Sequence, residues 1–119
     1  MKNLEKRKKI EELLLNLERL TREEIPEEEE SPCAFIFNYK KDFEINYGKI
    51  DISNMDYLIT LGSILTESVN FKSIVDLESG EIALFTDKKY KNIVLKILRL
   101  ILGDSIYPNE KVDEKKVQN

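Results

Sequence analysis

The sequence has 119 residues, of which 41% are hydrophobic, which suits one folded domain with a single modest core. The net charge of −4 argues against a general attraction to nucleic acid, and no apolar run approaches the roughly 20 residues that cross a membrane. Histidine is absent and Cys33 is the only cysteine, so an internal disulfide and any histidine-activated nucleophile are excluded. A lone cysteine, with no apolar signal core behind the basic N-terminus, predicts a reduced, cytoplasmic protein.

Residues 1–24 are expected to form an amphipathic N-terminal helix. Its apolar side chains recur at spacings of three and four and form one stripe: Ile10, Leu13, Leu14, Leu17 and Leu20. The next segment, IPEEEESP at 25–32, predicts an acidic linker, because its prolines end a helix and its glutamates favour a solvated path.

A strand hairpin is expected directly after this linker. CAFIFNY, residues 33–39, is apolar on both faces and predicts a buried strand. FEINYG, residues 43–48, alternates apolar and polar side chains and predicts the second strand, across a short turn at residues 40–42. The first strand is the more apolar, so it is expected to be the more buried of the two.

The segment SNMDYLITLGSILTESV, residues 53–69, predicts a central helix that is poor in ions. In a chain that is 35% charged, it carries only Asp56 and Glu67. Its apolar residues project from two faces, and one sheet can cover only one of them. The second face is expected to lie against either the N-terminal helix or the same helix of another subunit. The residues assigned to such a dimer interface are Tyr57, Leu61, Gly62, Ile64, Leu65 and Ser68.

A second hairpin and a last helix complete the predicted domain. Strands are expected at 71–77 and 81–86, with a turn at Ser79 and Gly80. The final helix is expected to be capped by Asp87 and to end at Gly103.

The element order predicts the fold class. Helix–strand–strand–helix–strand–strand–helix indicates an α+β domain, with helices packed on one antiparallel sheet. The α+β core is expected to span residues 33–104, followed by a flexible charged tail at 105–119.

The sequence contains no pattern that predicts catalysis, a cofactor or a metal site. Cys33 begins an apolar strand, where a buried structural thiol is the simpler interpretation. The carboxylates at 27–30 lie in the predicted linker, where nothing would desolvate them. A non-catalytic protein without cofactor or metal is therefore expected.

One basic cluster is a candidate contact for nucleic acid: Lys6, Arg7, Lys8 and Lys9. These side chains suit phosphate groups, but they equally suit the solvated face of the first helix. Glutamates interrupt the cluster, and no aromatic residues are interleaved with it to stack on bases.

The layout of three segments, 33–48, 53–69 and 71–86, resembles the roadblock family of dynein light-chain-like proteins. The resemblance covers about half of the chain and lies in the order of elements. It implies a small soluble homodimer that joins two sheets and two central helices and acts as a scaffold or regulator. A protein–protein interaction module is the expected function. The alternatives are a nucleic-acid-binding regulator that uses the first helix, and a small acidic chaperone-like dimer that wraps an unfolded client.

Overall fold

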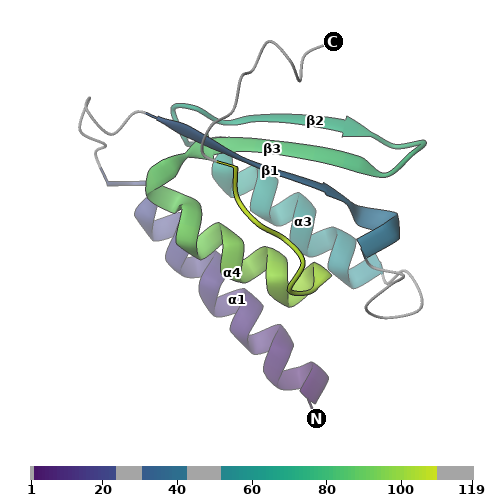
Figure 1. Ribbon diagram of the computed structural model, residues 1–119. Coiled ribbons are helices and arrows are strands. Elements are labelled where there is room, and N and C mark those ends of the chain that lie inside the picture. Colours follow the sequence, from purple (N-terminus) through teal and green to yellow (C-terminus); the bar gives the residue numbers. More distant parts are fainter. Residues whose placement is uncertain (1, 24–30, 43–51, 110–119) are drawn as a thin grey trace.

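The computed structural model describes residues 2–23, 31–42 and 52–109, and it has the α+β architecture expected from the sequence (Figure 1). In chain order the elements are α1 (Lys2–Leu20), β1 (Pro32–Asn38), α3 (Ile52–Leu65), β2 (Lys72–Asp76), β3 (Glu81–Asp87), the 3₁₀ helix η2 (Lys88–Tyr90) and α4 (Lys91–Leu102).

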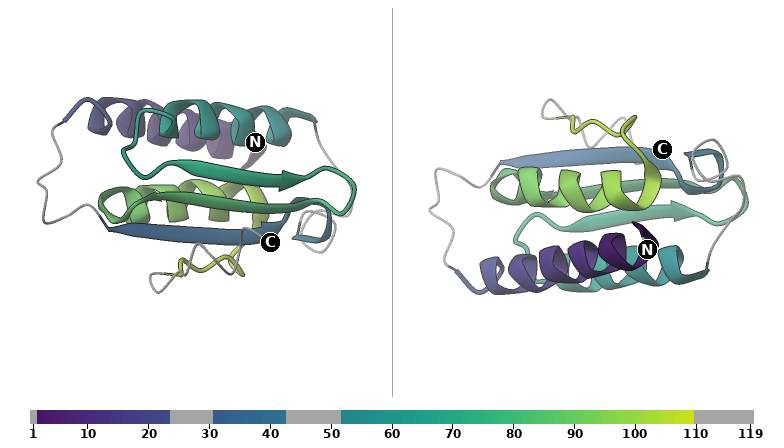
Figure 2. Two further views of the ribbon diagram at one scale, coloured as in Figure 1. Left: turned by 90° about the horizontal axis from the view of Figure 1, so that it is seen from above. Right: turned by 90° about the horizontal axis from the view of Figure 1, so that it is seen from below.

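The three strands form one antiparallel sheet in the order β1-β3-β2. β3 is central: Ile36 of β1 lies opposite Ala83 on one side, and Ile74 of β2 lies opposite Ala83 on the other. The helices lie on one side of the sheet, with α1 in contact with both α3 and α4 (Figure 1). Both views of Figure 2 show α3 on the side of the sheet that carries β2 and α4 on the side that carries β1.

The core lies between the helices and the helix-facing side of the sheet. The predicted stripe of α1 is confirmed, since Ile10, Leu13, Leu14 and Leu17 are buried and Leu20 packs against the same cluster. Alternate residues of β1 point into this core: Cys33, Phe35 and Phe37. A smaller apolar cluster lies on the opposite face of the sheet and consists of Ala34, Ala83 and Phe85, with Ile74 packed against it.

Two local expectations are confirmed and one is wrong. The second hairpin turns at Ser79 and Gly80, where Gly80 adopts the positive φ of 85° that glycine tolerates. α4 is followed by Gly103, whose N–H donates to the carbonyl of Arg99. The predicted cap by Asp87 is wrong, because its side chain makes no hydrogen bond to the helix that follows.

The first predicted hairpin is only partly described. β1 matches the expected strand, but residues 39–42 form a helical turn in place of the strand end and the tight turn. The expected second strand at 43–48 lies outside the described residues. Along its whole length β1 pairs with β3, so the sheet joins the two halves of the chain directly.

Tyr90 gives the first testable prediction. Its side chain is completely buried, and its hydroxyl has no hydrogen-bond partner among the described residues. An unsatisfied buried hydroxyl loses its bonds to water without replacement. Tyr90→Phe should therefore raise the free energy of unfolding by about 1 kcal/mol at neutral pH, measured by urea denaturation. Tyr107→Phe, at an exposed tyrosine, is the matched control and should change little.

The same substitution should alter the response to alkali. Burial, aided by the negative charges of Asp87 and Glu23, raises the pKa of Tyr90 above its ordinary value of 10.0. The unfolded chain therefore loses this proton first, and stability should fall as the pH rises above about 10. Tyr90→Phe should remove that part of the alkaline loss. A variant that is less stable than wild type at neutral pH would contradict the absence of a hydroxyl partner.

Candidate interaction surface

The outer edge of β2 offers backbone groups to a further strand. The N–H and C=O of Ala34 both bond to Asn109, on the side of β1 away from β3. In an antiparallel sheet, the backbone N–H and C=O groups of successive residues point to opposite edges of their strand. Two residues that lie opposite each other either both point toward the other strand or both point away from it. Ala34 points away from β3, so Phe85, which lies opposite it, points away from β1 and toward β2. Lys72 lies opposite Phe85, so the backbone groups of Lys72, Ile74 and Asp76 point toward β3. Ser73 and Val75 therefore present their N–H and C=O groups at the outer edge, and no other described strand pairs with that edge.

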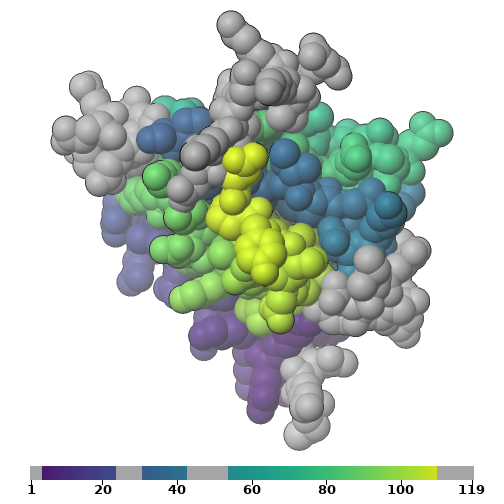
Figure 3. Space-filling view, in the orientation of Figure 1, coloured from purple at the N-terminus to yellow at the C-terminus, as the bar shows by residue number. Residues whose placement is uncertain are grey.

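The outer edge of β1, in contrast, is largely occupied. Pro32 has no N–H, Ala34 is bonded to Asn109, and the N–H of Asn38 donates to Oδ2 of Asp42 at 3.0 Å. Figure 3 shows the segment after α4, in yellow, lying against β1, in blue. Capping or covering a strand edge in this way is how proteins prevent unwanted strand addition. No described residue occupies the outward backbone groups of β2, which has only its short length and its charged Lys72 and Asp76 to limit strand addition.

Apolar side chains accompany the free edge of β2. Val75 is 50% exposed and Leu77 is 81% exposed. Both line a small pocket that also takes Met55 from the first half of α3. Ile59 follows Met55 by one helical turn, on the same side of α3, and is 63% exposed. The edge strand and this side of α3 therefore form one partly apolar surface, here called the β2–α3 surface.

Gly62 lies on the same side of α3, two turns after Met55. A Cβ atom added to Gly62 would meet no atom of the described residues within 4 Å, so no packing among them requires a glycine there. A glycine in a helix interior costs about 1 kcal/mol relative to alanine. Its use at an open position is consistent with close approach by a second molecule.

The predicted interface residues on α3 separate into three groups. Leu61 and Leu65 are completely buried within this chain, because α1 and α4 pack on α3. The sequence left two candidates to cover the second face of the central helix, the N-terminal helix and a second subunit. The N-terminal helix, α1, contacts it. Tyr57, Gly62 and Ile64 are partly buried.

Ser68, the remaining predicted interface residue, belongs to a buried polar cluster around Asp87. The Asp87 carboxylate accepts hydrogen bonds from the Ser68 hydroxyl, from the Asn70 amide and from the Val69 N–H, the last at 3.1 Å. Thr86 Oγ1 donates in turn to Ser68 Oγ at 3.3 Å. These donors draw the carboxylate toward the turn after α3, which is why it does not cap the following helix. The cluster ties residues 68–70 to the end of β3 and is structural.

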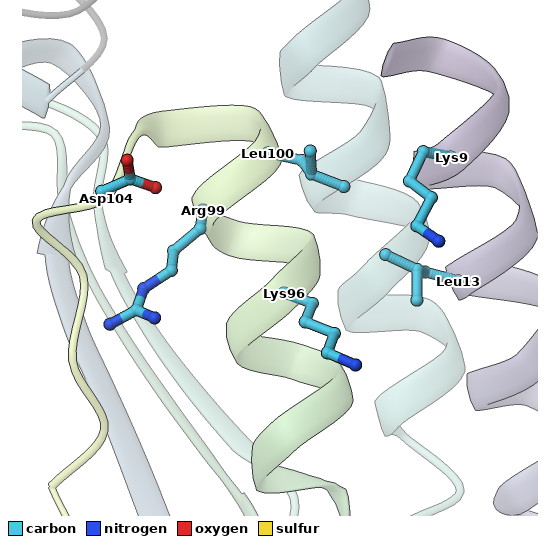
Figure 4. Close-up of a pocket in the computed structure, with 6 residues that line it drawn as sticks. All are labelled: Lys9, Leu13, Lys96, Arg99, Leu100 and Asp104. Carbon is cyan, nitrogen blue, oxygen red and sulfur yellow. The ribbon is translucent and has the colours of Figure 1, made fainter. Parts of the chain in front are cut away.

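The basic cluster of the first helix does not form one binding site. Lys9 lines a groove of about 250 Å³ between α1 and α4, where Figure 4 shows it across from Lys96, with Leu13 and Leu100 between them. Arg7 and Lys8 are exposed and do not line this groove, and Lys6 is half-buried.

The groove itself is poorly suited to nucleic acid. Arg99 points away from α1 in Figure 4, donates from Nε to the Ile106 carbonyl at 3.2 Å, and stacks on Tyr107 at 4.9 Å from the ring centre. Of the described basic residues that line the groove, Lys9 and Lys96 are therefore the two that face the space between the helices. None of the described lining residues is an aromatic on which a base could stack.

Cys33 and the described carboxylates are the side chains to compare with the needs of a reactive thiol and of a metal site. Cys33 is completely buried. No group of three or more His, Cys, Asp or Glu side chains within residues 2–23, 31–42 and 52–109 is placed to hold a metal ion. Over the same ranges, no helix combines the length and apolar character needed to span a bilayer.

The composition of β2 indicates in the sequence that this strand lies at an edge of the sheet. β2 carries Lys72, Ser73 and Asp76, whereas the other two strands are far more apolar, and such polarity is typical of an edge strand. Comparison with known proteins supplies no identity: no family model, curated protein or solved structure matches this chain.

Proposed function

We propose that this protein is a non-catalytic, cytoplasmic protein–protein interaction module that works as a homodimer and serves as a scaffold or regulator. The observation that carries the proposal is the free edge of β2, where Ser73 and Val75 present unpaired backbone groups while the opposite edge of the sheet is largely occupied. An edge of this kind is a template for pairing with another strand. An identical chain is the commonest partner in soluble assemblies, since a two-fold axis uses the same surface twice.

The β2–α3 surface gives the pairing an apolar contribution. Burial of Val75 and Ile59 against a second copy would remove exposed apolar area from water, at roughly 25 cal/mol per Å². The open position beside Gly62 leaves room for the neighbouring helix. This arrangement would join two sheets and bring two central helices together, as the roadblock resemblance implies, but on the outward side of α3 and without Leu61 and Leu65.

A proline at Ser73 tests the proposal. The Ser73 N–H points away from β3, so proline there removes no hydrogen bond within the chain, while its ring obstructs a strand added at the edge. We expect wild-type protein to sediment as a dimer at micromolar concentration, and Ser73→Pro to sediment as a folded monomer. Ser73→Ala is the matched control, because it keeps the N–H, and it should remain dimeric. A wild-type monomer at high micromolar concentration, or a dimeric proline variant, would refute dimerisation through this edge.

A further inference from the structure

The charged residues of β2 are arranged symmetrically about its centre. Lys72 and Asp76 each lie two positions from Ile74, and all three side chains are on the face of the sheet away from the helices. That face is fixed by the register, because Ile74 lies opposite Ala83 and packs against the cluster formed by Ala34, Ala83 and Phe85. Two copies of β2 in antiparallel orientation are therefore complementary in charge.

Backbone geometry restricts how two copies of β2 can pair. Residues that present their N–H and C=O groups outward must face each other, so Ser73 and Val75 are the residues that exchange bonds. With Ile74 on the two-fold axis, Ser73 lies opposite the partner's Val75, and the symmetric pair repeats the contact. Every outward group of these two residues is then used.

The same register places opposite charges together. With Ile74 on the axis, Lys72 lies directly opposite the partner's Asp76, in the non-hydrogen-bonded type of pair, whose side chains approach most closely. The Asp76 carboxylate accepts hydrogen bonds from the N–H groups of Ser79 and Glu78, which lower its pKa and favour the charged form. Ile74 meets its own copy, so the outer apolar clusters of the two sheets become continuous.

Neighbouring registers are poorer. With Ser73 on the axis, Val75 must pair with the partner's Phe71, whose N–H already donates to the Ser68 carbonyl. With Val75 on the axis, Lys72 lies opposite the partner's Glu78, which is in the turn beyond the end of the strand, and Asp76 lies against Ile74. Only the Ile74 register pairs both charges within the strand.

We propose that Lys72 and Asp76 determine the specificity of self-pairing, by fixing an antiparallel β2–β2 contact with Ile74 on the two-fold axis. The inference rests on the proposed homodimer and adds its register. Each dimer contains the Lys72–Asp76 contact twice, so one substitution per chain acts at two places.

Sedimentation equilibrium of Lys72→Glu tests the register first. Glutamate at this position would face the partner's Asp76 twice, and the dimer should dissociate at least about tenfold more readily than wild type. Lys96→Glu is the matched control, because it makes the same charge change at an exposed site on α4, and its dissociation constant should stay near that of wild type. High salt should strengthen the Lys72→Glu dimer and weaken the wild-type dimer.

Mixing variants identifies the contact partner. Asp76→Lys alone should also be a weak dimer, since it places Lys72 opposite a second lysine. An equimolar mixture of Lys72→Glu and Asp76→Lys should form a heterodimer near wild-type affinity, because both contacts are again between opposite charges. Glu78→Lys is the control for the alternative register: alone it should dimerise normally, and it should not rescue Lys72→Glu.

The outcomes separate the register from the dimer. A dimeric wild type in which Lys72→Glu and Lys96→Glu dissociate equally would overturn the register and leave the homodimer standing. If Glu78→Lys restored dimerisation of Lys72→Glu, the two-fold axis would lie at Val75 instead of Ile74. Because Asp76→Lys removes the acceptor of the β2–β3 turn, its circular dichroism is checked first. If it does not fold, the salt response of Lys72→Glu decides: a dimer that salt does not strengthen overturns the register.

Discussion

Replacing Asp87 with alanine is expected to destabilise the fold by about 3–5 kcal/mol, a large fraction of the total stability of a domain of this size. The carboxylate is completely buried and accepts bonds from Ser68, Val69 and Asn70. Without it, the buried Ser68 hydroxyl loses its acceptor, and the partly buried bonds from Val69 and Asn70 are lost as well. The turn that joins α3 to β2 would then lose its attachment to β3. Urea denaturation followed by circular dichroism measures the effect.

Two further substitutions make this result specific. Asp87→Asn keeps the shape and one acceptor oxygen but loses the charge, so it should cost less than alanine. Asp104→Ala removes an exposed carboxylate just beyond α4 and should change stability by less than about 0.5 kcal/mol. If Asp87→Ala were as stable as Asp104→Ala, the buried cluster would not hold the turn in place.

Leu61→Ala is expected to cost about 3 kcal/mol, and Leu61→Glu is expected to prevent folding altogether. Leu61 is completely buried in the core beneath α1, so truncation leaves a cavity and a glutamate would bury an unpaired charge. Leu61 was assigned to a dimer interface from sequence, and on that hypothesis Leu61→Glu would produce a folded monomer. Thermal denaturation of the alanine variant and circular dichroism of the glutamate variant distinguish the two results.

Ile59 is the matched position on the same helix. It is exposed and belongs to the β2–α3 surface, so Ile59→Ala should leave the stability of the monomer within about 0.5 kcal/mol of wild type. Its effect should appear in sedimentation as weaker association. A stable monomer of Leu61→Glu, or a large loss of stability in Ile59→Ala, would reverse the roles given to these residues.

The spacing of apolar residues predicted the secondary structure reliably. The spacing of apolar residues located α1, α3 and α4, and the hairpin turn at Ser79 and Gly80 located β2 and β3. Such patterns depend on neighbours within one element, and these are fixed by local geometry. The α+β class followed from the order of the elements.

The long-range contacts were not contained in those patterns. The apolar second face of α3 has to be covered, but periodicity does not say which element covers it. In the structure α1 and α4 both contact α3, and Leu61 and Leu65 are completely buried. For the same reason the sequence predicts a local helix cap at Asp87, because the donors that its carboxylate meets, Ser68 and Asn70, lie far away in the sequence. The free edge of β2 depends on strand order, which puts β3 and not β2 in the centre.

The unequal edges of the sheet bear on the size of any assembly. A sheet with two open edges can recruit copies at both and grow into a filament. Here Asn109 and Asp42 occupy backbone groups of β1 on either side of Ile36, so within the described residues β2 is the more open edge. If two copies pair there, as proposed, they use that edge in both molecules, and this limits further growth into a filament.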